Sequence, residues 1–322
     1  GFDPTMIVGG KVADFGSNAM SGEGDIIVIE ADEYDRTFLR LTPVYAVITS
    51  IEEEHLDTYE DLDDLKSAFV QYANSVPFFG AAILCLDDPT VQEIIGEIDR
   101  RVLTYGLNRQ ADVRAERVER DGFTSRFTVY REQEELGTIT LEVPGEHNVR
   151  NALAAVAVGL ELDVSFEAIR AGLQAFTGVH RRFEVKGEVE GVTVVDDYAH
   201  HPTEIRATLE AVHEGWPDRR VLVAFQPHLY SRTRDFLEEF ARSFFNADVL
   251  VVTDVYPARE DPIPGIDGEA IADRARSYGH HEVRYEPNLD QLPETLLELV
   301  EPGDMVLTLG AGDIWRYGET FV

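Results

Sequence analysis

The sequence predicts an α/β protein built from two successive domains. Short apolar runs typical of strands alternate with helix-length segments along most of the 322 residues. This alternation breaks between Val179 and Gly187, and a second series of the same kind then begins. Because a chain of this length is long enough for about two domains, we place the junction near residue 185. The expected domains are therefore residues 1–184 and 185–322.

The first domain is expected to contain a mostly parallel sheet with antiparallel strands added to it. Strands are expected at residues 25–30, 45–50 and 82–86, and each is followed by acidic or polar residues. Residues 111–143 alternate between apolar and polar side chains, which favours antiparallel hairpins. An alanine-rich helix is expected at residues 148–162. The single cysteine, Cys85, falls in an apolar run and is expected to be a buried, unreactive side chain.

The second domain is expected to be doubly wound and Rossmann-like. Five apolar runs, separated by helix-length segments, are the candidate strands, and they cover residues 192–195, 221–225, 249–253, 282–285 and 305–309. Helical crossovers between such strands imply a parallel sheet with helices on both faces.

The charge of the chain excludes several classes of partner. Asp and Glu number 61 against 28 Lys and Arg, which gives a formal net charge of -33. Such a field repels nucleic acid and anionic membranes. Since the sequence also has neither a long apolar stretch nor a signal-peptide pattern at its start, we expect a cytoplasmic protein. The excess of acid indicates a high-salt cytoplasm, and a merely acidic enzyme is the alternative.

Two acidic segments follow strands of the first domain and are candidates for a magnesium site. Residues 30–35 place four carboxylates after a run expected to be a buried strand, and His55 lies in the acidic segment after the next strand. Carboxylate oxygens suit Mg²⁺, which keeps phosphates and waters for its other positions. Glu30 and His55 are the metal candidates. A solvated acidic turn and a surface histidine are the competing interpretations.

Two further segments carry groups suited to a nucleotide. Gly145 permits a tight turn into a helix whose first turn offers His147, Asn148 and Asn151, side chains that can hydrogen-bond a purine edge. Near the domain junction Arg182 belongs to a pair of arginines suited to bidentate phosphate contact. The structural alternatives are an asparagine helix cap and an ion pair.

The second domain gathers polar residues after three of its strands. Asp197, Tyr198 and His200 follow the first strand, and the proline after them can occupy the first turn of a helix. The next strand leads into His228 and Arg232, and the last strand leads into residues 310–313, Gly-Ala-Gly-Asp. Because open α/β sheets bind ligands beyond the carboxyl ends of their strands, these loops predict a site. The two glycines are expected to permit a close backbone approach.

Taken in order, these motifs resemble the Mur ligases, the ATP-dependent ligases of peptidoglycan synthesis. The resemblance covers essentially the whole chain and rests on the motifs Glu-Ala-Asp-Glu, Pro-Gly-x-His-Asn-x-x-Asn-Ala, Asp-Asp-Tyr-Ala-His-His-Pro-Thr-Glu and Phe-Gln-Pro-His-x-Tyr-Ser-Arg-Thr-Arg. It implies the central ATPase domain and the C-terminal ligase domain of that family. Within the family the chain is most similar to the branch that joins L-alanine to UDP-N-acetylmuramate through an acyl phosphate.

The resemblance also implies roles for particular residues. Glu30 and His55 would bind Mg²⁺; His147, Asn148 and Asn151 would lie at the adenine; Arg182 would contact an ATP phosphate and Asp197 the ribose. The muramate carboxylate and the incoming alanine would be held by Tyr198, His200, His228 and Arg232, of which the last three are the catalytic candidates.

Departures from the family pattern lead to further expectations. The chain shows no Gly-x-x-Gly-Lys-Thr phosphate loop, so the polypeptide alone is expected to be inactive as a ligase. Leu229 stands where many relatives carry arginine. A ligase that attaches a whole tripeptide to the same nucleotide and a non-catalytic nucleotide-binding remnant are the alternative functions.

Overall fold

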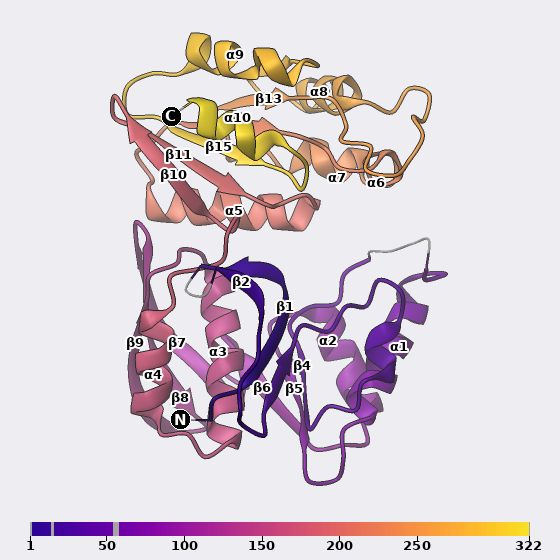
Figure 1. Ribbon diagram of the computed structural model, residues 1–322, viewed down its shortest axis with the longest axis vertical. Helices are drawn as coiled ribbons and strands as arrows, with labels where there is room; N and C mark the ends of the chain where they lie inside the picture. The colour runs from indigo at the N-terminus through magenta and orange to yellow at the C-terminus, as the bar shows by residue number, and fades with distance from the viewer. Residues whose placement is uncertain (1, 14–15, 54–57, 322) are drawn as a thin grey trace. The chain divides into compact units, whose positions relative to one another are not determined.

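The computed structural model describes residues 2–13, 16–53 and 58–321, and its elements are labelled in Figure 1. The chain forms two compact units. The first contains Gly1–Arg120, Thr124–Glu142 and Glu146–Thr177, and the second contains Asp121–Phe123, Val143–Gly145 and Gly178–Val322. Within the described ranges, no helix has both the length and the apolar content needed to cross a lipid bilayer.

A six-stranded sheet forms the centre of the first unit. Its order is β4-β5-β6-β7-β8-β9. The strands are β4 (Tyr45–Ile48), β5 (Ala81–Cys85), β6 (Val102–Gly106), β7 (Val113–Asp121), β8 (Thr124–Arg131) and β9 (Glu134–Leu141). The neighbours from β4 to β7 pair in parallel, whereas β8 and β9 form an antiparallel hairpin. The expected parallel sheet with added antiparallel strands is confirmed.

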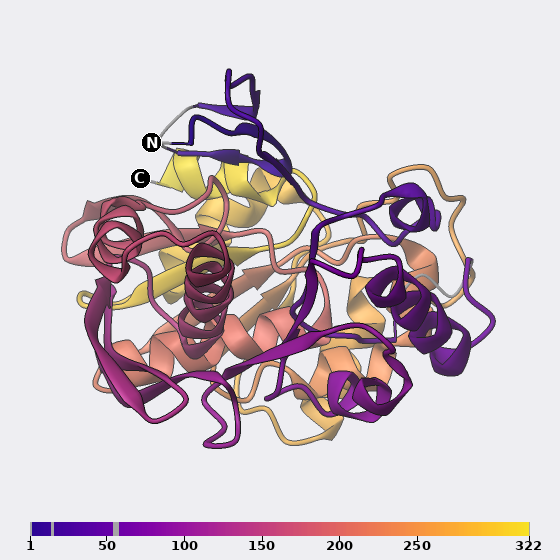
Figure 2. The ribbon, with the colours of Figure 1, turned by 90° about the horizontal axis from the view of Figure 1, so that it is seen from below.

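Helices cover both faces of the parallel part of this sheet (Figure 2). On one face α1 (Leu62–Asn74) and α2 (Pro89–Ile94) pack with β4 and β5 around a core that includes Leu65 and Leu84. The alanine-rich helix, α3 (Glu146–Glu161), packs against β5 and β6, and α4 (Phe166–Ala175) packs against β9. Cys85 is buried in β5, and burial raises the pKa of its thiol, so it is the inert core residue expected.

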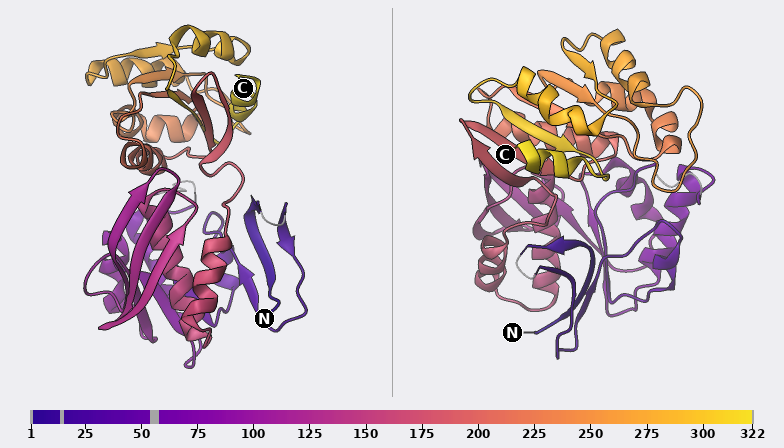
Figure 3. Two further views of the ribbon diagram at one scale, coloured as in Figure 1. Left: turned by 90° about the vertical axis from the view of Figure 1, so that its left-hand side faces the viewer. Right: turned by 45° about the horizontal axis from the view of Figure 1, so that its top comes forward.

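The remaining strands of the first unit form a separate three-stranded sheet, drawn in indigo in Figure 3. Its order is β2-β1-β3, with β1 (Thr5–Val12), β2 (Ser17–Met20) and β3 (Ile27–Ile29). The expectation of a buried strand at residues 25–30 was wrong, because Ile27 is 57% exposed and Val28 is 51% exposed. The physical reason is that β3 is an edge strand of this small sheet and does not lie inside the six-stranded one.

The second unit is built on another six-stranded sheet, of order β10-β11-β15-β12-β13-β14. Its strands are β10 (Glu184–Val189), β11 (Val192–Asp197), β12 (Val221–Phe225), β13 (Val249–Val252), β14 (Val283–Tyr285) and β15 (Met305–Leu309). The last five pair in parallel, as expected. The edge strand β10 is antiparallel to β11 and was not expected. Because β10 spans residue 185, the junction expected there falls inside a strand of the second unit.

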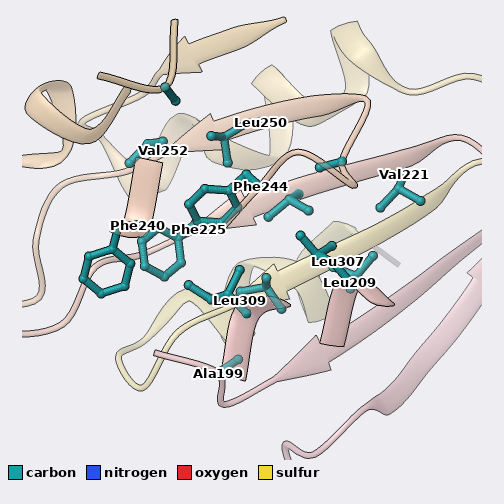
Figure 4. Close-up of a cluster of buried hydrophobic side chains, with 14 of the residues drawn as sticks. Ala199, Leu209, Val221, Phe225, Phe240, Phe244, Leu250, Val252, Leu307 and Leu309 are labelled. Atoms are coloured by element: carbon teal, nitrogen blue, oxygen red, sulfur yellow. The ribbon is translucent and has the colours of Figure 1, made fainter. Parts of the chain in front are cut away.

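Two layers of helices make this unit doubly wound. Helices α5 (Pro202–Gly215), α7 (Leu237–Arg242) and α8 (Gly268–Ser277) share one core with alternate side chains of the sheet, part of which is drawn in Figure 4. Helices α9 (Leu292–Leu299) and α10 (Ile314–Phe321) share the core on the opposite face. The loops after β11, β12, β13 and β15 therefore leave the carboxyl edge of one parallel sheet, where ligands bind in such folds.

Candidate functional site

The loop after β11 begins with a buried carboxylate. Asp197 is 6% exposed, and its two oxygens accept hydrogen bonds from the backbone N–H groups of Phe183 at 2.9 Å and Ala199 at 2.8 Å. Burial raises the pKa of Asp197 to about 6, against the lowering effects of the Arg182 charge and these hydrogen bonds. The carboxylate thus joins the backbone just before β10 to the backbone just after β11.

The next residues of this loop are held by the first turn of α5. His201 is the N-cap of α5, Pro202 occupies the first turn as expected, and Glu204 closes a capping box. The Glu204 carboxylate accepts hydrogen bonds from the backbone N–H groups of His200 at 2.9 Å and His201 at 3.2 Å, and it lies 3.1 Å from Nδ1 of His200. Burial opposes ionisation of Glu204, but its contacts with His200 and the charge of Arg182 hold its pKa well below the usual range. His200 is therefore fixed through both its backbone and its ring.

Side chains from three loops meet around His228. Its ring lies 5.9 Å from the ring of His200 and stacks at 5.6 Å on Tyr256, while the ring of Tyr198 lies 5.3 Å from that of His200. Among the residues that the structure describes, the buried Nδ1 of His228 has no hydrogen-bond partner. Burial, together with the charges of His200 and Arg232, lowers the pKa of His228 to about 4. The ring is therefore neutral at neutral pH, and its stacking partners and the neighbouring charge hold it in place.

Arg232 lies beside this imidazole on α6 (Tyr230–Asp235), and its charge contributes to the lowered pKa of His228. The turn that leads into α6 contains Leu229, whose φ of 73° lies in the left-handed region. A bulky side chain in that region is strained, by about 1–3 kcal/mol. Such strain persists where surrounding contacts fix the backbone, and it is frequent at functional sites.

The two neighbouring arginines near the junction have different partners. Arg181 donates to Asp196 at 2.9 Å and to the carbonyl oxygens of Gly310 and Gly312. It therefore ties β11 to the loop after β15 and is structural. Arg182 is half exposed, forms an ion pair with Glu204 at 3.1 Å and lies over the ring of Tyr198. Both guanidiniums lie over the ring of Tyr198, Arg181 at 4.9 Å and Arg182 at 5.5 Å from its centroid, but of the two it is Arg182 that pairs with Glu204, the carboxylate that holds His200.

The glycine loop at residues 310–313 makes the close approach that its sequence predicts, but to this protein's own side chains. A Cβ on Gly312 would lie 2.3 Å from Oε1 of Gln226 and 2.8 Å from the ring of Tyr256. The same Gln226 oxygen accepts a hydrogen bond at 3.1 Å from the N–H of Ile314, the first residue of α10. The loop thus supports Tyr256, which in turn stacks on His228.

In the first unit, the first two turns of α3 carry His147, Asn148 and Asn151, and Asn151 is exposed. Gly145, with φ 95°, makes the expected tight turn before the helix. Glu146 in the first turn forms ion pairs with Arg120 and Arg150, and Arg150 also lies 3.6 Å from Asp87, which follows β5. These contacts fix the start of α3 against the end of β5.

Of the two metal candidates, Glu30 lies within the described residues. Glu30 follows β3 and accepts a hydrogen bond from the N–H of Gly9 at 2.6 Å. Asp32 and Asp35 accept hydrogen bonds from the backbone two residues ahead, so both close local turns. His55 lies outside the described residues. In the described part of the chain, no three His, Cys, Asp or Glu side chains are grouped to hold a metal ion.

Several residues of the second-unit group were missed by sequence reasoning. Tyr256 and Glu260 come from the loop between β13 and α8, Gln226 was given no role, and Arg181 was expected only as one of a pair of phosphate-binding arginines. Gln226 stands inside the Phe-Gln-Pro-His segment and Arg181 stands beside Arg182. Both could therefore have been predicted from motifs already recognised in the sequence. Tyr256 and Glu260 lie in a loop rich in proline and acid, where no spacing distinguishes them from solvated residues.

Known proteins resemble the chain over its full length. Residues 13–159 match the Mur ligase middle domain, and residues 181–312 match the Mur ligase glutamate ligase domain. A UDP-N-acetylmuramate--L-alanine ligase of Salinibacter ruber is 69% identical over 322 residues, which are 100% of this chain and 68% of the relative. One of Desulfatibacillum aliphaticivorans is 52% identical over 100% of this chain and 71% of its own length. The crystal structure of UDP-N-acetylmuramate-alanine ligase from Thermotoga maritima has a TM-score of 0.81, at 29% identity, over 99% of this chain and 68% of that one.

Proposed function

The chain belongs to the Mur ligase family, and we propose that the protein joins L-alanine to the carboxylate of UDP-N-acetylmuramate with ATP as the energy source. The observation that carries this proposal is the 69% identity to a ligase of that name along the entire chain. The neutral histidine, the two arginines and the tyrosine that meet beyond β11 and β12 supply the chemistry that the reaction needs. Since ATP, UDP-N-acetylmuramate and L-alanine are all small polar molecules, we place the protein in the cytoplasm.

We propose residues for ATP in each unit separately. In the first unit, His147, Asn148 and Asn151 offer hydrogen-bonding groups to the adenine from the start of α3. In the second unit, Arg182 is the cation for a phosphate, and it would exchange its ion pair with Glu204 for that contact. Asp197 is assigned to the ribose through the lone pairs that its two backbone hydrogen bonds leave.

The donor and the acceptor are assigned to the group around His228. The muramate carboxylate attacks the γ-phosphorus of ATP, and ADP leaves. The amine of alanine then attacks the acyl phosphate, and inorganic phosphate leaves with the C–O bond electrons. Arg232 would hold the carboxylate of alanine and His200 that of the muramate, and Tyr198 would pack beside His200. His228, being neutral, can accept a hydrogen bond from the amine, and the departing phosphate, a stronger base than this imidazole, takes the proton that the amine loses.

Magnesium is assigned to Glu30 and His55. The Glu30 carboxylate fits because it is a hard oxygen ligand that uses one oxygen on Gly9. Bound there, Mg²⁺ would neutralise charge on the phosphate oxygens.

The test is release of inorganic phosphate from ATP by the complete gene product that contains this chain. We expect release only when both UDP-N-acetylmuramate and L-alanine are present, with the alanyl nucleotide identified by mass spectrometry. The tripeptide L-alanyl-γ-D-glutamyl-diaminopimelate, added in competition, separates the two muramate ligases. A higher kcat/KM for the tripeptide, or no release dependent on alanine, would overturn the proposal.

A further inference from the structure

A neighbouring loop of the second unit forms hydrogen bonds with the turn that carries His228 and Arg232. This loop joins β13 to α8, and Tyr256 pairs with His228 as an isolated parallel bridge. The N–H of Tyr256 donates to the carbonyl of Pro227 at 2.7 Å, and the N–H of Leu229 donates to the carbonyl of Tyr256 at 3.0 Å. The backbone of the strained residue Leu229 is thus held on one side.

The same loop holds the other side of Leu229 through a carboxylate. Glu260 accepts hydrogen bonds from the N–H of Ser231 at 2.9 Å and from its hydroxyl group. Both carboxylate oxygens are used, one on each donor. The hydrogen bonds from Ser231 lower the pKa of Glu260 against the effect of its burial, so the group is ionised at neutral pH.

This second contact matters because α6 has no cap of its own. Leu229 stands at the N-cap of α6 and provides no side-chain hydrogen bond. Ser231 lies in the first turn, where backbone N–H groups have no partner within the helix. Glu260, in the loop between β13 and α8, supplies that partner to Ser231. Ser231 is the residue immediately before Arg232. Without this contact, the strained turn would be free to relax, and Arg232 would move relative to His228.

We infer that Glu260 is a positioning residue of the acceptor site, which holds the first turn of α6 so that Arg232 and His228 keep the geometry that binds the amino acid. The inference rests on the proposed function, since it assigns the incoming amino acid to these two side chains. Glu260 itself contacts no reacting atom. Its effect passes through Ser231, so loss of the carboxylate should affect the amino-acid substrate selectively.

The experiment compares steady-state kinetics of the complete gene product and its Glu260→Ala, Glu260→Gln and Asp261→Ala variants. Asp261 is the matched control, because it is an exposed acid on the same loop. For Glu260→Ala we expect the KM for L-alanine to rise about 10- to 100-fold, while the KM values for ATP and UDP-N-acetylmuramate stay unchanged. Glu260→Gln should keep the KM for L-alanine close to the wild-type value, since its amide can accept from the N–H and donate to the hydroxyl of Ser231.

Other results would contradict the inference. An unchanged KM for alanine in Glu260→Ala would overturn it, as would a parallel rise of all three KM values or an equal effect of Asp261→Ala. If Glu260→Ala does not fold, Ser231→Ala decides, because it removes only the hydroxyl contact and should raise the KM for alanine alone. A wild-type enzyme that releases no phosphate with alanine would instead overturn the proposed function itself.

Discussion

At the scale of single residues, the site depends on charges that the fold holds away from water. Ionisation of Asp197 at neutral pH lowers the free energy of unfolding, because burial raises its pKa from 3.8 to about 6. The folded state therefore binds the Asp197 proton more tightly than the unfolded state does. Its contribution to the free energy of unfolding is fully present below pH 4 and is lost as the pH rises through about 6.

The variant Asp197→Asn tests this, because asparagine does not titrate. We expect the free energy of unfolding of the wild type, minus that of Asp197→Asn, to fall by about 2 kcal/mol between pH 4 and pH 7. Denaturant unfolding of both proteins across this range measures the difference. Asp218→Asn, at an exposed acid, should show no such trend. A difference that rises with pH for Asp197 would contradict the assignment.

The sequence was enough to predict which residues gather in the second unit, but it could not distinguish the roles of two adjacent arginines. Tyr198, His200, His228 and Arg232 were selected because each follows a strand end, and the structure brings them together. Arg181 and Arg182 have the same chemistry but different ion-pair partners, and they lie in a backbone turn with positive φ at both Arg181 and Phe183. That turn leaves no mark in the sequence.

At the scale of elements, the loop after β15 packs against Tyr256, whose ring contacts His228. Gly312 leaves no room for a side chain, because a Cβ there would meet Gln226 and Tyr256. Gly312→Ala must displace at least one of them, and overpacking of this kind costs about 1–3 kcal/mol. We therefore expect a lower melting temperature and a higher KM for alanine, since Tyr256 stacks on His228. Gly172→Ala in α4, where nothing lies within 4 Å, should instead leave the KM unchanged and stabilise the protein. Equal effects of the two substitutions would contradict this account.

Elements with buried apolar runs were predictable, and elements without them were not. Four parallel strands of the second unit, β11, β12, β13 and β15, are buried along their whole length because helices cover both faces of the sheet there. In contrast, β10 alternates charged residues with valine at a sheet edge, and β1 and β2 lie in a small exposed sheet. Their pairing depends on neighbours distant in sequence. The same limit explains why β3 was expected to be buried.

At the scale of the whole molecule, the formal net charge of -33 on 322 residues opposes the folded state. The ion pairs on the surface are individually weak, so repulsion among the excess acids is the larger electrostatic effect. Salt screens charges separated by more than about 10 Å at 0.1 M and about 3 Å at 1 M. Added salt should therefore relieve repulsion more than it weakens attraction.

We expect the melting temperature of the protein to rise as sodium chloride increases from low to molar concentration. Sucrose, which carries no charge, separates screening from general exclusion of a cosolute. A variant with Glu210, Glu239 and Glu294, all exposed, changed to lysine should begin at a higher melting temperature in low salt and gain less from added salt. A flat or falling melting temperature in the wild type, or the same salt gain in the variant, would show that acid repulsion does not limit its stability.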